Sequence, residues 1–79
     1  MSQSNLEKFL MEEKLRNATE QELFDMVFDV ECRCMEPKSK HYNTFQTVTR
    51  MLIEKYDGMW KNFVADDPDA VKEVILKFG

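Results

Sequence analysis

The chain has little glycine, proline or cysteine, with two residues of each among its 79. Because Gly and Pro interrupt regular structure, and few stretches alternate apolar with polar residues, this composition favours helices over sheet. Two cysteines separated by a single residue do not make the disulfide framework of a small secreted domain. The sequence therefore predicts a helical protein with reduced cysteines.

Long apolar runs, a signal peptide and a basic surface are missing as well. Runs such as Met51-Leu52-Ile53 are far too short to span a bilayer, and residues 1–7 lack the basic and apolar regions of a secretory signal. The net charge of −4 makes approach to nucleic-acid phosphates or to anionic lipids unfavourable. We expect a cytoplasmic protein with no nucleic-acid partner and no direct membrane insertion.

The dominant apolar pattern runs from Tyr42 to Phe63. Its members recur at spacings of three and four residues, the period of one helix face: Phe45, Val48, Leu52, Tyr56, Met59 and Phe63. Gly58 is either the C-cap of a shorter helix or an interior glycine that costs about 1 kcal/mol relative to Ala. Because the apolar residues keep the same helical spacing on both sides of Gly58, we predict one helix over 42–63, with any bend at that glycine.

The N-terminal residues predict a first helix from Ser4 to about Asn17. Ser4 and Glu7 have the spacing of a capping box, in which each side chain binds the backbone N–H of the other residue. The apolar residues of this helix fall on two adjoining faces, Leu6, Phe9 and Leu10 on one and Met11 and Leu15 on the other.

Two further helix starts are marked in the sequence. Thr19 and Glu22 repeat the capping-box spacing and predict a helix over 20–35, which Pro37 ends because the residue before a proline avoids the α region. Its wide apolar arc predicts that it is sandwiched between other helices. Asp67 and Pro68 are a preferred N-cap and first helical residue, so they predict a last helix over 68–78. We predict a single all-α domain spanning 1–79, a compact bundle of three to four helices.

Cys32, Cys34 and His41 are the soft metal ligands that lie near one another in the sequence. A structural zinc site usually has four ligands, and two cysteines one residue apart on a helix point about 200° apart. No Gly-rich phosphate loop, Gly-x-Ser-x-Gly elbow or His-Glu-x-x-His motif occurs. We predict no catalytic site, no metal and no cofactor. The alternative is a small metal- or thiol-dependent regulator or enzyme that uses these three residues.

Six methionines are the most unusual feature of the composition. Methionine adapts to irregular surfaces, either in a core or at an interface. Met51 and Ile53 lie about 100° to either side of Leu52, so they cannot both point into the core with it. We therefore expect a small acidic regulator that binds another protein, and we expect homo-oligomers. The predicted partner-binding residues are Met51, Ile53, Met59, Trp60 and His41.

A short, acidic, Met-rich helical chain with one mid-chain histidine, His41, resembles the small cytoplasmic regulators of T4-type bacteriophages. Among them are the lysis-inhibition co-antiholins, which match in length and in lacking a signal or membrane segment. The resemblance implies a protein that binds the cytoplasmic part of a phage holin, a membrane protein, and delays lysis. Phage inhibitors directed at host proteins have the same general character. No binding residue is carried over from the family.

Overall fold

The computed structural model describes residues 2–79, with side chains from Asn5 onward. Over these residues the chain forms five helices and no strand, which confirms the all-α prediction and corrects the predicted three to four helices. The helices are α1 (Ser2–Arg16), α2 (Glu20–Cys34), α3 (Tyr42–Tyr56), α4 (Trp60–Asp66) and α5 (Pro68–Phe78).

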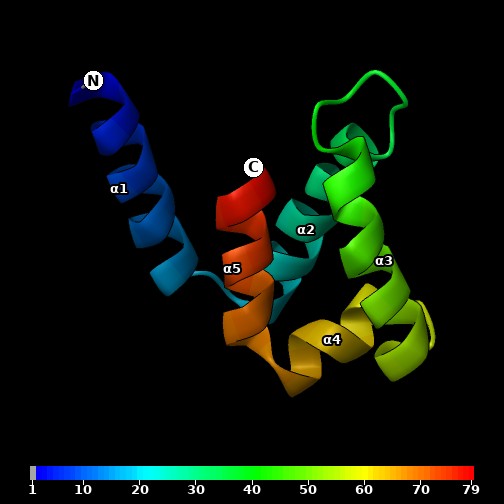
Figure 1. Cartoon of the computed structure of the whole chain (residues 1–79). Coiled ribbons are helices and arrows are strands. Elements are labelled where there is room, and N and C mark those ends of the chain that lie inside the picture. Colours follow the sequence, from blue (N-terminus) through cyan, green and yellow to red (C-terminus); the bar gives the residue numbers. More distant parts are fainter. Residues whose placement is uncertain (1) are drawn as a thin grey trace.

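Helices α2 and α5 pack against each other in the middle of the molecule, and the other three helices surround this pair (Figure 1). α1 lies on one side of this pair against α5, and α3 lies on the other side. The short α4 crosses one end and contacts α2, α3 and α5. The loop between α2 and α3 lies at the opposite end (Figure 1).

The core is built from the inward faces of these helices. On α2 and α5 the buried residues recur at intervals of three and four, Leu23, Val27, Val30 and Cys34 facing Val71, Ile75 and Phe78. Phe45 of α3 is fully buried, and its ring meets the ring of Phe78 edge-on with centroids 5.1 Å apart. Trp60 and Phe63 of α4 stack at 5.7 Å beside them. The aromatic residues therefore join α3, α4 and α5 into one core.

Two of the predicted helix starts are confirmed. The Thr19 hydroxyl accepts a hydrogen bond from the Glu22 N–H at 3.2 Å, and the Glu22 carboxylate accepts one from the Thr19 N–H at 2.8 Å. This backbone hydrogen bond lowers the pKa of Glu22, because it favours the charged carboxylate. Asp67 accepts a hydrogen bond from the Ala70 N–H at 3.2 Å, and α5 begins at Pro68 as predicted.

The prediction of one continuous helix over 42–63 is wrong. α3 ends at Tyr56, and Asp57 and Gly58 both adopt the left-handed conformation, with φ of 55° and 74°. The N–H of Gly58 donates to the carbonyl of Leu52 at 3.1 Å, which closes the end of α3. The Tyr56 hydroxyl donates to Asp66 at 2.8 Å, so the end of α3 is also tied to the end of α4. This hydrogen bond raises the pKa of Tyr56, since its proton is the one donated.

The start of the first helix also differs from the prediction. α1 begins at Ser2, so Ser4 lies within the helix rather than at its N-cap. The side chain of Ser4, and with it the predicted capping box with Glu7, lies outside the described residues. The helix ends at Arg16, one residue before the predicted end.

The overall shape is flat, with extents of 39 × 30 × 15 Å along the principal axes. Several large apolar side chains are exposed. No helix in the described part of the chain is long and apolar enough to cross a membrane.

Candidate protein-interaction surface

The break between α3 and α4 brings three of the five predicted partner-binding residues together. Ile53 is 60% exposed at the end of α3, and Met59 is 52% exposed just before α4. Trp60 follows directly and is only 5% exposed, so it forms the floor beneath them rather than part of the open surface. A Cβ added to Gly58 would lie 3.9 Å from Cγ1 of Ile53, which places Ile53 at the edge of this site.

The opposite wall comes from α2 and contains two phenylalanines that the sequence analysis did not assign to a site. Phe28 is 51% exposed, and Phe24 beside it is half-buried, with the two ring centroids 6.3 Å apart. Between the two walls lies an open cavity of about 270 Å³. We call it the Phe28 groove, and its lining residues are Phe24, Phe28, Glu31, Gly58, Met59, Trp60 and Lys61.

The floor of the groove is held in place by a polar contact. The indole N–H of Trp60 donates to the carboxylate of Glu31 at 2.9 Å, which links α4 to α2 across 29 residues of sequence. The indole ring itself stacks on the ring of Phe63 in the core. Because the indole nitrogen already has its partner and the ring is packed, the floor is preorganised for an apolar group.

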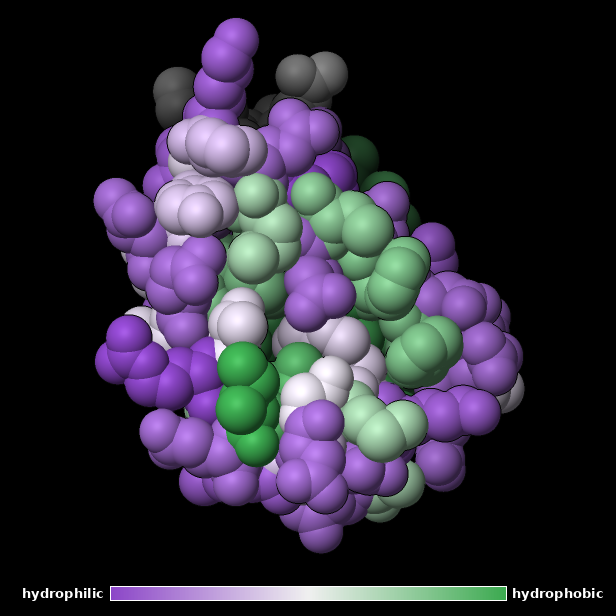
Figure 2. All heavy atoms as spheres, turned by 90° about the vertical axis from the view of Figure 1, so that its right-hand side faces the viewer, coloured by the Kyte–Doolittle hydropathy of each residue, from purple (hydrophilic) through white to green (hydrophobic). Residues whose placement is uncertain are grey.

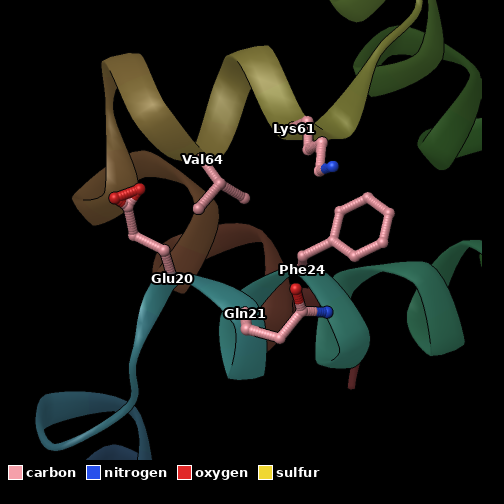
Figure 3. Close-up of a pocket in the computed structure, with 5 residues that line it drawn as sticks. All are labelled: Glu20, Gln21, Phe24, Lys61 and Val64. Carbon is pink, nitrogen blue, oxygen red and sulfur yellow. The ribbon is translucent and has the colours of Figure 1, made fainter.

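A smaller cavity of about 110 Å³ continues the groove toward the start of α2. Figure 3 shows Lys61 and Val64 reaching from α4 toward α2, where Phe24 and Glu20 lie across from them. Phe24 and Lys61 line both cavities, so the two form one surface between α2 and α4. This surface combines an apolar floor with charged groups at its edge.

The charge of the molecule is concentrated on α2. The helix carries five carboxylates and one guanidinium, a net charge of −4, which equals that of the whole chain. Of these groups, Glu20 lines the smaller cavity and Glu31 lines the Phe28 groove. Arg33 is paired with Asp29 at 3.1 Å on the exposed side of the helix. The α2 wall of the groove is therefore acidic.

The other two predicted residues, Met51 and His41, lie elsewhere. Met51 is half-buried and packs against the core, so the exposed member of the pair Met51 and Ile53 is Ile53. Met51 also lines a second groove of about 260 Å³ between α3 and α5. His41 is half-buried and meets the ring of Phe78 edge-on at 5.4 Å, so it contributes to the end of the core.

The face of α3 shows the same mixture of apolar and polar groups. Figure 2 shows apolar side chains gathered in the middle of the face that carries α3, with hydrophilic side chains around them. Interfaces commonly have this arrangement of an apolar centre and a polar rim. The prediction that Met59 shares one face of a continuous helix with Phe45 and Leu52 is wrong, because the chain breaks before Met59, which is 52% exposed while the other two are buried.

A separate exposed apolar face lies on α1. Leu6, Phe9 and Leu10 are all 55–56% exposed, whereas Leu15 on the other side of the helix is buried and Met11 packs against the core. α1 therefore packs through the Met11 and Leu15 face, and the face predicted to be its first apolar stripe is open to solvent.

The residues of the alternative metal or thiol site have different surroundings. Cys32 is exposed and Cys34 is buried, both as free thiols, and burial raises the pKa of the Cys34 thiol. His41 packs on Phe78 instead. Among the residues that the structure describes, no group of three or more His, Cys, Asp or Glu side chains is placed to hold a metal ion.

In comparisons with known proteins, no family, no curated protein and no solved structure matches this chain.

Proposed function

We propose that this chain is a small acidic regulator that acts by binding another protein through the Phe28 groove. The observation that supports the proposal most is the exposure of Phe28, Met59 and Ile53 around one preorganised floor. Each of these side chains is at least half exposed, and burying a large apolar side chain stabilises a complex by about 1.5–3 kcal/mol when the burial is complete.

The composition of the groove supports a protein partner. Aromatic residues and methionine are enriched at the centres of protein interfaces, and a flexible methionine can repack against different side chains. Met59 stands at the edge of the groove in a short connection between two helices, where its side chain has room to adjust. Phe28 is fixed on the middle of a long helix, so it provides a rigid anchor.

The resemblance to phage lysis-inhibition proteins makes the cytoplasmic part of a holin the first partner to test. Under this proposal the chain binds that segment in the cytoplasm and delays the action of the holin. A host protein inhibited by the same surface is the second partner class. Both give the groove the same role, that of an anchor for an apolar segment of the partner.

A pull-down with matched variants tests the proposal. Wild type, Phe28→Lys and Phe9→Lys are used as baits in extracts of the native host, and bound proteins are identified by mass spectrometry. Phe9 is the control because it is as exposed as Phe28 but lies on α1. We expect a partner that binds wild type and Phe9→Lys and is lost with Phe28→Lys. A partner that Phe28→Lys retains would place the binding site outside the groove.

Homo-oligomers are the second part of the proposal. The exposed faces around Phe28 and around Leu10 each offer an apolar surface to another copy of the chain. Sedimentation equilibrium across a range of concentrations measures the association. If dimers form, Phe28→Lys and Leu10→Lys show which face is used, because each change places a charge in one of the two. A wild type that stays monomeric throughout overturns this part.

A further inference from the structure

The Phe28 groove has a length and a charge that define its occupant more closely than the proposed function does. Along the Phe28 groove and the smaller cavity that continues it, the lining residues of α2 extend from Glu20 to Glu31, a distance of about 17 Å along the helix axis, or three helical turns. A surface of this length, with Trp60 and Val64 on its α4 side, fits the apolar face of a short amphipathic helix, which presents anchors at positions i, i+4 and i+7.

The charge of the α2 wall indicates which charged residues the bound helix carries beside its apolar face. α2 carries a net −4; Glu20 lines the smaller cavity and Glu31 lines the Phe28 groove. Asp25 accepts a hydrogen bond at 3.1 Å from Gln21, which also lines the smaller cavity. Lys61 is the basic member of the lining, and it stands on the α4 wall. Carboxylates along one wall attract a segment with lysine or arginine beside its apolar anchors, and they repel an acidic one.

We propose that the occupant of the Phe28 groove is a cationic amphipathic helix of a partner protein. Its apolar face contacts Phe24, Phe28 and Met59, and its basic residues lie over Glu20 and Asp25. This inference rests on the proposed function and names the chemistry of the segment that the groove binds.

The protein carries its own reporter for this binding. Trp60 is the single tryptophan of the chain, and it forms the floor of the groove. The indole is only 5% exposed, so an occupant on the floor removes little water from it but changes the groups packed around it. A change in the intensity or the maximum of Trp60 emission therefore reports occupancy, and isothermal titration calorimetry measures the affinity independently of the indole.

The test is a titration of the intact protein, followed by calorimetry and by Trp60 emission, with three synthetic helical peptides of equal length. One combines leucine with lysine, one leucine with glutamine and one leucine with glutamate. We expect the Leu/Lys peptide to bind most tightly, with an affinity that falls as salt screens the charges. The Leu/Glu peptide is expected to bind at least about tenfold more weakly, since tenfold corresponds to a 1.4 kcal/mol difference.

Matched variants locate the binding. Phe28→Ala is expected to weaken the Leu/Lys peptide about tenfold or more, whereas Phe9→Ala on α1 leaves the affinity unchanged. Asp25→Asn is expected to weaken it about threefold, as for an exposed charge pair, and Glu7→Gln on α1 is its control. Glu31 is left intact because it holds Trp60. Circular-dichroism melts of each variant establish that the fold is retained.

Two results overturn the inference in different ways. Equal, Phe28-dependent binding of all three peptides would mean that the groove binds apolar segments without regard to charge, which leaves the proposed function standing. Peptide binding that Phe28→Ala does not change, or no binding of any peptide in calorimetry, would mean that the groove does not accept a helix. The pull-down with Phe28→Lys then decides the proposed function separately.

Discussion

Replacing Gly58 with alanine tests whether the chain breaks between α3 and α4, which is the feature that forms the Phe28 groove. Gly58 has a φ of +74°, and an L-residue in this left-handed region costs about 1–2 kcal/mol. The lower entropy of alanine in the unfolded chain offsets about 0.4–1 kcal/mol of that. The added Cβ would lie 3.9 Å from Ile53, an ordinary contact, so crowding adds nothing. We expect a net loss of about 1 kcal/mol.

A continuous helix through Gly58 predicts the opposite sign for the change in stability. If residues 42–63 formed one helix, Gly58→Ala would stabilise the protein by about 1 kcal/mol through helix propensity. Urea unfolding separates the two cases, because a loss of 1 kcal/mol lowers the midpoint by roughly 1 M at a slope of about 1 kcal/mol/M. Asp57→Asn is the control and should leave stability within about 0.5 kcal/mol, since asparagine also tolerates the left-handed region. A higher midpoint for Gly58→Ala would refute the break.

Four other predictions concern α3, the cap of α2 and the two cysteines. Leu52→Ala should cost about 2–5 kcal/mol in urea melts because the side chain is buried, whereas Ile53→Ala on the exposed side should cost less than about 1 kcal/mol; equal costs would contradict the orientation of α3. Thr19→Ala should cost about 1 kcal/mol through the lost cap. Because the folded pKa of Glu22 lies below its ordinary value of 4.5, its contribution to stability is complete above pH 4.5 and is lost as the pH falls through the folded pKa; Glu22→Gln should remove this dependence in pH-dependent melts. In native protein one thiol, that of Cys32, should react quickly with a thiol reagent and the second only on unfolding; two fast thiols would contradict the buried position of the other cysteine.

The helix starts at Thr19 and Pro68 were predictable because their signals are local. A capping box and an Asp-Pro pair act within three or four residues, so the sequence alone specifies them. The bounds of α2 and α5 accordingly agree with the prediction to within one residue. The all-α fold follows from the same local signals together with the helical period of the apolar residues.

The break at Gly58 was not predictable from periodicity. The spacing from Tyr56 to Met59 and Phe63 suits a continuous helix, and the same residues also suit a turn followed by a new helix. What decides between them is tertiary: Tyr56 binds Asp66, and Trp60 binds Glu31 on α2. The first contact spans ten residues and the second 29, so the periodicity of residues 42–63 does not reveal them.

The candidate site was predictable in part, because some of its residues are close together in the sequence and others are not. Ile53 and Met59 were two of the five predicted partner-binding residues, with the choice between Met51 and Ile53 as the exposed residue left open, and in the structure both are exposed near Gly58. Phe28 was missed because its place opposite Met59 depends on how α2 packs on α4. The exposed face of α1 was missed because a helix with two apolar faces does not specify which one packs inward.

The most direct test of the groove as the binding surface is a residue-resolved titration by NMR. Amide spectra of isotopically labelled protein are recorded as the Leu/Lys peptide is added. The account predicts that the signals of Phe24, Phe28, Gly58 and Met59 and the indole N–H of Trp60 shift together, while those of Phe9 and Leu10 on α1 stay in place. Shifts concentrated on α1, or spread evenly over all five helices, would contradict it.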